Sequence, residues 1–314
     1  KASVEISDRT STMADNISQV KELKTALDSG TISEQEAYQA KSNLLSIQSQ
    51  LSDSYGDQAS NIDLVNGKLD EQIEKMQQLQ IQDAENYLND NEDAYQIAKD
   101  KLTKDNYYSF GNIDKTGKKN KRLISQLQDI AKEVDGIELS SNNNGSMFVH
   151  FTGDAYKAND AINEFMSKVR DLKNEMGENA DTSAIDDLLS SANNEMKKAT
   201  DLIDTHGDTY KTYLQQKMIK DGFGDGSPKA IYDDYTKAVQ DYNDALASGD
   251  TSAIDKAKTS FDNVQSSVDG VVKKYPEYKS MFDEVGDALD EATIKSNDFT
   301  KALAGKDFKD IVSK

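Results

Sequence analysis

Two histidines, His150 and His206, are the residues to test first for catalysis or metal binding, because the chain has no others and no cysteine. A zinc or acid–base site needs partners at fixed spacing, such as HExxH, and none occurs. His150 stands between apolar residues in an alternating segment, and His206 precedes a glycine where a helical pattern pauses. We interpret His150 as an outer-face strand residue and His206 as lying at a helix C-terminus, near the negative end of the helix dipole.

The glycine-rich segment at 221–228 contains two aspartates that suggest a calcium loop. Asp221 and Asp225 offer carboxylates, but an EF-hand needs oxygen ligands at alternate positions and a glutamate at position twelve. The glycines also follow a helical pattern rather than a strand, so a phosphate-binding loop is not indicated. We expect a capped turn here, with Ser227 as the N-cap of a helix that begins at Pro228.

A basic run at 115–122 is the one local reversal of charge: Lys115, Lys118, Lys119, Lys121 and Arg122. Such a run can contact a phosphate backbone or an acidic partner, but a solvated loop is the commoner role, and no aromatic residues interleave here. We interpret the asparagines at 142–144 as a turn rather than as a ligand site. No Gly-x-Ser-x-Gly elbow, which would indicate a serine nucleophile, is present. We expect no catalytic, cofactor-binding or metal-binding residues and no enzyme activity.

Composition limits the partners of the chain. It has 314 residues, 37 basic against 57 acidic side chains, and a net charge of −20, which disfavours binding to nucleic acids and anionic membranes. No apolar run approaches the ~20 residues that span a bilayer. The first twelve residues contain no apolar run, so we expect no signal peptide. The chain opens with Lys rather than Met, so we expect a section of a longer protein. Hydrophobic residues make up only 36%, which favours helical hairpins over thick layered folds.

The stretch 62–102 carries the longest helical pattern. One narrow apolar stripe runs through Ile62, Val65, Leu69, Ile73, Met76 and Leu79, and then Tyr87, Leu88, Ala94, Tyr95, Ala98 and Leu102. Its spacing predicts one coiled-coil-like helix of about 60 Å, with Gly67 inside it. Stripes at 12–27 and 38–51 predict a helical hairpin before it. Thr31 or Ser33 can cap its second helix, and Glu36 stands in the capping-box relation to Ser33.

The composition changes at Tyr107. Alternating residues on both sides of Asn144 and Gly145 predict a β-hairpin between 136 and 153, and the helical patterns around it give an α-β-β-α order over 119–176. Further helices are predicted at 185–203 and 210–219. A second hairpin follows at 229–274, in which Tyr235 and Tyr242 have the spacing of core residues, and another helix starts at 275.

The predicted fold class is therefore mainly α: elongated helical hairpins or coiled coil with a small inserted α-β-β-α module. We expect three regions, a long helical hairpin or coiled coil at 1–106, a small α/β module at 107–178, and a second helical hairpin or bundle at 179–314. Narrow apolar stripes also predict self-association, because they leave apolar surface that another helix can cover.

Four segments resemble the internal helical region of tail tape measure proteins from phages and prophages of Gram-positive bacteria. They read ISQVKELKTALDSGTISEQEAYQAKSNLLSIQSQLSD, NIDLVNGKLDEQIEKMQQL, VHFTGDAYKANDAINEFMSKVRDLKNEMG and YDDYTKAVQDYNDALASGDTSAIDKAKTSFDNV. The order of helical hairpin, β-hairpin module and second helical hairpin is also similar. The resemblance covers a large part of the chain and brings no catalytic motif with it.

The resemblance implies a non-enzymatic section of a virion protein that lies in the tail lumen, sets tail length and supports tail assembly. It implies synthesis in the host bacterial cytoplasm and, as partners, the tail tube protein, tail assembly chaperones and tail tip proteins. The alternative is a helical stalk of a secreted or cell-surface adhesin, or of a toxin-delivery protein. Neighbouring tail genes would favour the first hypothesis, and a secretion signal or cell-wall anchor would favour the second.

Overall fold

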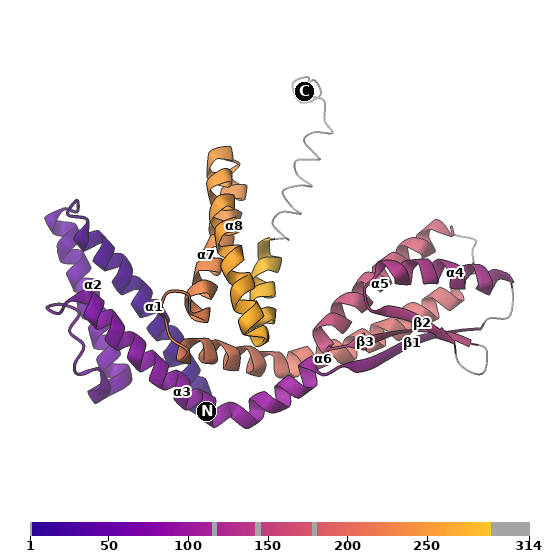
Figure 1. The fold of residues 1–314 in the computed structure, drawn as a ribbon, viewed down its shortest axis with the longest axis horizontal. Coiled ribbons are helices and arrows are strands. Elements are labelled where there is room, and N and C mark those ends of the chain that lie inside the picture. The colour runs from indigo at the N-terminus through magenta and orange to yellow at the C-terminus, as the bar shows by residue number, and fades with distance from the viewer. Residues whose placement is uncertain (1, 115–117, 142–145, 178–180, 290–314) are drawn as a thin grey trace, which may run out of the picture. The chain divides into compact units, whose positions relative to one another are not determined.

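The structure is a computed structural model that describes residues 2–114, 118–141, 146–177 and 181–289 (Figure 1). These residues are mainly α-helical, as predicted, with one small antiparallel sheet. The chain forms two compact units, which are treated separately below. The helical unit combines Lys1–Asn91 with Thr212–Lys314, and the sheet unit is Glu92–Lys211. The coiled-coil character of the helices and the three predicted regions stay predictions.

The helical unit begins with the predicted hairpin, formed by α1 (Ala2–Asp28) and α2 (Glu34–Tyr55). Gly30 turns the chain with a positive φ of 63°, which glycine adopts without a steric penalty. The capping box is confirmed: the Ser33 backbone N–H donates to Glu36 Oε2 at 2.7 Å, and the Glu36 N–H donates to Ser33 Oγ at 3.3 Å. Two otherwise unpaired N–H groups at the start of α2 are thereby satisfied.

The prediction of one helix over 62–102 is wrong at its start, because α3 spans Leu69–Thr103. Asp63 organises a turn before it: Oδ1 accepts from the backbone N–H of Val65 at 3.1 Å and of Asn66 at 2.9 Å. An aspartate that bonds the backbone in this way competes with helix formation. Ile62 is buried although it lies in the turn. The 35 residues of α3 give about 52 Å of helix rather than 60 Å.

The core of this helix trio is built from one stripe on each helix and from the turn before α3. Its members are apolar, with one tyrosine, and three of them lie between α2 and α3, in the 3-10 helix η1 (Gly56–Ala59) and the segment after it: Met13, Ile17, Val20, Leu44, Ile47, Leu51, Tyr55, Ala59, Ile62, Leu64, Ile73 and Met76. The predicted stripes therefore close on one another within the chain. Small aliphatic seams of this kind are typical of helix-on-helix packing.

Residues 183–220 form one helix, α6 (Ser183–Lys220), where two were predicted with a break near Gly207. Gly207 has no positive φ, so its backbone continues the helix. A glycine inside a helix costs about 1 kcal/mol relative to alanine. At this position, a Cβ would lie 3.7 Å from the Tyr156 hydroxyl, which is an ordinary van der Waals contact, so an alanine would also fit. His206 accordingly lies inside a helix and not at its end.

The second predicted hairpin is confirmed as α7 (Pro228–Ser248) and α8 (Thr251–Lys274), which lie side by side in Figure 1. Ser227 Oγ accepts from the Ala230 N–H at 3.2 Å, as expected of an N-cap before Pro228. Asp250 caps α8. The chain continues through a 3-10 turn, η2 (Pro276–Tyr278), into a helix over 279–289. The apolar positions predicted at 299–311 lie outside the described residues.

Inside this hairpin, two tyrosine rings of α7 contact one phenylalanine of α8. The ring centroids of Tyr235 and Tyr242 lie 5.7 Å and 6.0 Å from that of Phe261. Tyr235 is buried and Tyr242 is half-buried, so the predicted core role holds fully for the first and partly for the second.

The sheet unit contains three strands, β1 (Asn106–Asp114), β2 (Ile137–Ser141) and β3 (Ser146–Gly153), in the order β1-β3-β2 and all antiparallel. The predicted hairpin is confirmed by β2 and β3, with Leu139 opposite Val149. Its turn at 142–145 lies outside the described residues. The sequence analysis missed β1. Its register shifts between Phe110 and Ile113, so the strand has no continuous alternation that a period-2 search would detect.

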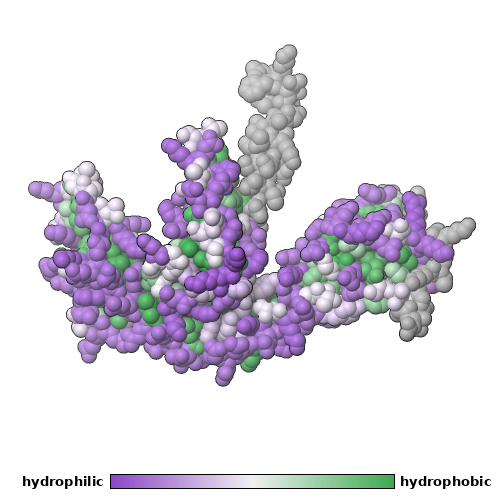
Figure 2. All heavy atoms as spheres, in the orientation of Figure 1, coloured by the Kyte–Doolittle hydropathy of each residue, from purple (hydrophilic) through white to green (hydrophobic). Residues whose placement is uncertain are grey.

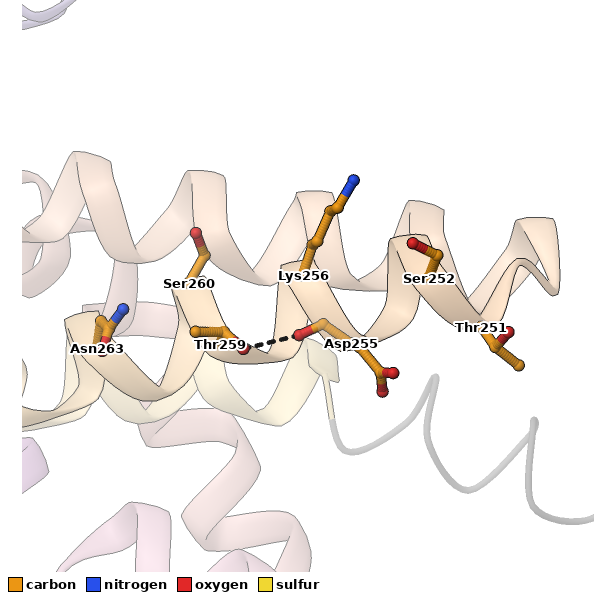
Figure 3. A pocket seen from close by; sticks show the side chains of 7 residues that line it. All are labelled: Thr251, Ser252, Asp255, Lys256, Thr259, Ser260 and Asn263. Carbon is orange, nitrogen blue, oxygen red and sulfur yellow. Dashed lines mark hydrogen bonds between the residues drawn. The ribbon is translucent and has the colours of Figure 1, made fainter.

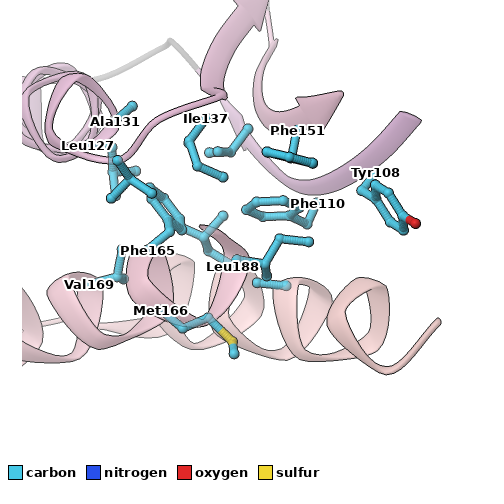
Figure 4. Close-up of a cluster of buried hydrophobic side chains, with 14 of the residues drawn as sticks. Tyr108, Phe110, Leu127, Ala131, Ile137, Phe151, Phe165, Met166, Val169 and Leu188 are labelled. Atoms are coloured by element: carbon cyan, nitrogen blue, oxygen red, sulfur yellow. The ribbon is translucent and has the colours of Figure 1, made fainter. Parts of the chain in front are cut away.

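The core of the sheet unit lies between the sheet and its helices. α4 (Lys118–Glu133) and α5 (Ala155–Glu175) pack on one face of the sheet, and the first half of α6 adds Ile185, Leu188 and Ala192 to this core. Figure 4 shows these side chains converging, and the rings of Phe110 and Phe165 lie 5.7 Å apart. The α-β-β-α order is thus present, with β1 and α6 as additional elements.

Candidate functional site

The two histidines lie in different elements. His206 lies within α6, and His150 lies on β3 with 7% of its surface exposed. His150 Nε2 is 3.4 Å from Glu138 Oε2, and its Nδ1 is buried without a hydrogen-bond partner. Among the described residues, no three His, Asp or Glu side chains gather as a metal site would require. The interpretation of His150 as an outer-face strand residue agrees with its position.

One surface hollow, of about 520 Å³, runs along a single helix (Figure 3). Its lining residues all belong to α8: Thr251, Ser252, Asp255, Lys256, Thr259, Ser260 and Asn263. The Thr259 hydroxyl donates to the Asp255 backbone carbonyl at 2.8 Å, within its own helix. Ligand sites are usually concave and largely apolar, so this hydrophilic groove on one helix is a poor candidate.

The glycine-rich segment lines a second hollow of about 490 Å³, together with α8 residues such as Lys274. Asp221, one of the two candidate calcium ligands, accepts a hydrogen bond at 3.1 Å from the Tyr278 hydroxyl. Gly222 and Gly226 have positive φ values, and the Ser227 N–H donates to the Gly224 carbonyl at 2.9 Å. The segment is therefore a hydrogen-bonded turn, as interpreted from the sequence.

The strongest polar cluster lies inside the α1–α2–α3 trio and is centred on Asp83. Arg9 Nε on α1 donates to Asp83 Oδ2 at 3.1 Å, and Arg9 Nη2 donates to Oδ1, which makes a bidentate pair. The Tyr55 hydroxyl of α2 donates to Asp83 Oδ2 at 2.9 Å, and the guanidinium lies 5.2 Å from the Tyr55 ring centroid. One carboxylate of α3 thus bonds to both other helices.

The residues of this cluster differ in how far they are buried. The Asp83 side chain is only 4% exposed, whereas that of Arg9 is 39% exposed. Burial, followed by the charge of Asp83, raises the pKa of the Tyr55 hydroxyl well above its ordinary value, so Tyr55 remains a donor. A buried carboxylate is tolerated only when hydrogen bonds and an opposite charge replace its water. Here, those groups come from two other helices.

One turn earlier on α3, Gln80 makes a second buried polar contact. Its Nε2 donates to the Thr10 carbonyl oxygen on α1 at 2.9 Å, and Gln80 is fully buried. Gln80 and Asp83 occupy the same stripe of α3 as Met76 and Tyr87. Two polar residues within an otherwise apolar stripe are the sequence signal that could have indicated these buried contacts. The sequence analysis passed over these two positions. A single polar pair in a helical seam can fix which registers are allowed.

A second cluster joins the end of α6 to η2. Lys217 Nζ donates to Glu277 Oε1 at 2.6 Å and lies 5.7 Å from the ring centroid of Tyr278, which is fully buried. Burial first, and then the charge of Asp221, raises the pKa of the Tyr278 hydroxyl. The sequence offers no pattern that pairs these residues, because 60 positions separate Lys217 from Glu277.

These two clusters hold helices together and present no reacting pair. Neither places a nucleophile beside a free base, and their carboxylates already accept bonds from cations and phenols. Figure 2 shows a mostly hydrophilic surface on the face in view. Of the helices described, none is both long and apolar enough to cross a bilayer. Both clusters join residues of different elements through hydrogen bonds and ion pairs.

Comparisons with protein-family models, with curated proteins and with solved structures find no match to this chain.

Proposed function

We propose that this chain is a non-enzymatic structural section of a tail tape measure protein. It would lie in the tail lumen of a virion, set tail length and support tail assembly after synthesis in the bacterial cytoplasm. Its partners would be the tail tube protein, the assembly chaperones and the tail tip proteins. The resemblance of the four quoted segments supports this role, and the net charge of −20 supports the absence of nucleic-acid binding.

The observation that carries the proposal is the presence of long uninterrupted helices. α3 has 35 residues and α6 has 38. Because a helix rises about 1.5 Å per residue, these helices correspond to about 52 Å and 57 Å, and a chain built from them converts residue number into length. The polar groups of both clusters bond to neighbouring helices, which is consistent with a structural role.

The closed α7–α8 hairpin makes the length hypothesis quantitative. If the hairpin opens inside the tail, deletion of its 46 residues at 229–274 removes up to about 70 Å of helix. If it stays closed, the two antiparallel helices overlap and the loss is about half of that or less. Opening would require replacing the contacts of Phe261 with Tyr235 and Tyr242 by contacts with tube protein or a sister chain.

The test is tail length, measured by electron microscopy of phage that carry an in-frame deletion of 229–274. A matched variant that duplicates the same segment should lengthen the tail by the amount that the deletion shortens it. Unchanged tails in both variants would contradict the proposal and favour the stalk of an adhesin or toxin-delivery protein. The duplication retains every native element, so it tests the ruler even where the deletion yields no tails.

We also propose that the chain self-associates through exposed apolar residues. Tyr38 and Leu45 on α2 are 77% and 59% exposed and lie seven residues apart, on one side of the helix and outside its buried stripe. Light scattering at micromolar concentrations should show an assembly larger than one chain. The double variant Tyr38→Ser and Leu45→Ser should shift it toward the monomer, and strictly monomeric wild-type protein would rule the idea out.

A further inference from the structure

The outer face of the sheet carries a row of aromatic rings, one of which, Tyr107, is exposed. Residues directly opposite one another in the ladder point to the same face, and Tyr108 and Phe110 point into the core. The intervening positions of β1 and β3 therefore point outward, as do their partners on β2. These outward residues are Tyr107, Ser109, Asp114, Glu138, Ser140, Ser146, Phe148, His150 and Thr152.

Three rings form the row. The centroids of Tyr107 and His150 are 5.0 Å apart, and those of His150 and Phe148 are 5.8 Å apart. Tyr107 is 56% exposed, Phe148 is half-buried, and His150 is packed between them. Tyr107 is an exposed aromatic side chain that the core of the unit does not use. An exposed aromatic row on a rigid sheet is a stacking platform, because its ring faces are held at fixed positions.

Polar groups stand beside the rings, and three of them, on Glu138, Ser109 and Ser140, belong to exposed or half-buried residues. The Glu138 side chain is 75% exposed, and its carboxylate lies next to His150. Ser109 is exposed, and Ser140 is half-buried on the neighbouring strand. The buried Nδ1 of His150 has no partner in the protein. The face thus combines ring surfaces with acceptors and hydroxyl groups, which suits a ligand that has both C–H faces and O–H groups.

Charge decides which class of ligand fits this face. The outward residues of the three strands, as far as they are described, include two carboxylates, Asp114 and Glu138, and no lysine or arginine. Nucleic-acid stacking platforms pair their rings with basic residues that neutralise phosphates, and this face would repel them. Anionic lipid surfaces are disfavoured for the same reason.

We propose that the outer face of this sheet binds a neutral glycan. The apolar face of a sugar ring would stack on Tyr107, since C–H groups carry the partial positive charge that the negative ring face attracts. Sugar hydroxyls would donate to the Glu138 carboxylate and exchange hydrogen bonds with Ser109. This activity goes beyond the structural role proposed above, and its failure would leave that role untouched.

The two histidines make the test specific. When residues 1–314 are labelled at histidine, the ring signals of His150 and His206 are the only two expected in the NMR spectrum. Addition of a neutral hexasaccharide, either β-1,4-linked N-acetylglucosamine or β-1,4-linked glucose, should shift the His150 signal and leave that of His206 in place. Tyr107→Ala should weaken the affinity by about threefold to tenfold, as expected for the loss of one stacked ring.

The matched control is Tyr38→Ala, which removes an even more exposed tyrosine from α2 and should leave the affinity unchanged. Circular dichroism melts of both variants would show that each keeps its fold. Absence of a His150 shift with both hexasaccharides would overturn the proposal. A shift produced by oligodeoxythymidine and not by the glycans would overturn it as well, in favour of nucleic-acid stacking. A change in oligomeric state on Tyr107→Ala, without glycan binding, would instead assign the face to a second copy of the chain.

Discussion

The two compact units stabilise their helices in different ways. In the sheet unit, the core is apolar and rich in large rings, such as Phe110, Phe151 and Phe165. In the helical unit, polar residues are buried beside small aliphatic seams: Thr10, Asn16, Gln72, Gln80, Asp83 and Gln216. Among the described residues of the sheet unit, His150 is the one buried residue that is polar or charged. Its side chain lies on the outer face of the sheet rather than in the core.

This difference follows from the surfaces that each unit can bury. A sheet face covered by helices excludes water over a broad area, so apolar packing alone selects the arrangement. Two or three amphipathic helices meet along narrow stripes, and a shift of one helix turn would bury similar apolar area. The bonds from Asp83 to Arg9 and Tyr55 are lost in a shifted register. We infer that the helical unit relies on polar contacts for uniqueness and the sheet unit on packing.

The largest expected effect is the loss of a ring from the core of the sheet unit. Phe165 is fully buried and contacts Phe110, so Phe165→Ala should lower the free energy of unfolding of this unit by about 3–5 kcal/mol through lost transfer energy and a cavity. Hydrogen exchange measured by mass spectrometry, peptide by peptide, should show lost protection across Glu92–Lys211 and little change in α2.

The control for this variant is Ile97→Ala, which shortens an apolar residue of the same unit that is 57% exposed. Its effect should stay within about 0.5 kcal/mol. If Phe165→Ala lowers protection in α1 and α2 as much as it does in Glu92–Lys211, the two units unfold together. Their stabilities then cannot be compared separately.

The second effect breaks the polar cluster of the helical unit. Arg9→Ala leaves the Asp83 carboxylate buried with only Tyr55 as its donor. We expect a loss of about 2–3 kcal/mol, below the usual cost of breaking a fully buried pair because the Arg9 side chain is 39% exposed. Asp83→Ala should cost less, since it leaves no buried charge. If urea denaturation gives the same loss of stability for Arg9→Ala and Asp83→Ala, the Arg9–Asp83 pair behaves like a solvent-exposed ion pair.

The double variant Arg9→Met with Asp83→Leu separates stability from register. Apolar replacement of an ion pair often restores stability, so its free energy of unfolding should approach that of the native chain. If the polar contacts specify register, the double variant should show broadened NMR signals in α1 and α2 at unchanged stability. Sharp native-like spectra would indicate that packing of the seam is sufficient.

The third effect is a loss of stability at high pH, arising from Tyr55 and Tyr278. Burial raises the folded-state pKa of both hydroxyls above the ordinary value near 10. The unfolded chain therefore loses these protons first as pH rises, so the stabilisation is complete below about pH 10 and falls above it. Melting temperatures between about pH 8 and about pH 11 should drop, and Tyr55→Phe should flatten the drop. Tyr38→Phe, at an exposed position, should not alter the slope.

The sequence was informative wherever a local rule decides the structure. The α2 cap at Ser33, the α7 start at Pro228 and the β2–β3 hairpin all depend on a few neighbouring residues, and each was predicted. The failures occurred where a local signal conflicts with packing. Gly207 suggested a helix break, but a glycine inside a helix costs only about 1 kcal/mol, and α6 continues through it. The bulge in β1 removed the alternation that would have identified the third strand.

The polar clusters could not be predicted from the sequence, for a different reason. Asp83 bonds to Arg9, 74 positions away, and Lys217 to Glu277, 60 positions away, so no spacing rule connects them. A polar residue inside an apolar stripe indicates that it has a hydrogen-bond partner, but the sequence does not show which residue that partner is. The outer-face row of Tyr107, Phe148 and His150 likewise depends on strand order, which brings β1 beside β3.

The smallest effect tests a contact that belongs to neither kind of core, the capping box of α2. Ser33→Ala removes an acceptor for the Glu36 N–H and should cost about 1 kcal/mol. The Ser33 N–H, and then its hydroxyl, lowers the pKa of Glu36, so the stabilisation is present above the ordinary carboxylate pKa and is lost as pH falls. The Ser33→Ala loss in urea titrations should therefore shrink at acidic pH. Ser42→Ala, at an exposed position within α2, should be neutral or slightly stabilising, because alanine has the higher helix propensity. A Ser33→Ala loss that is independent of pH would show that Glu36 contributes nothing to the cap.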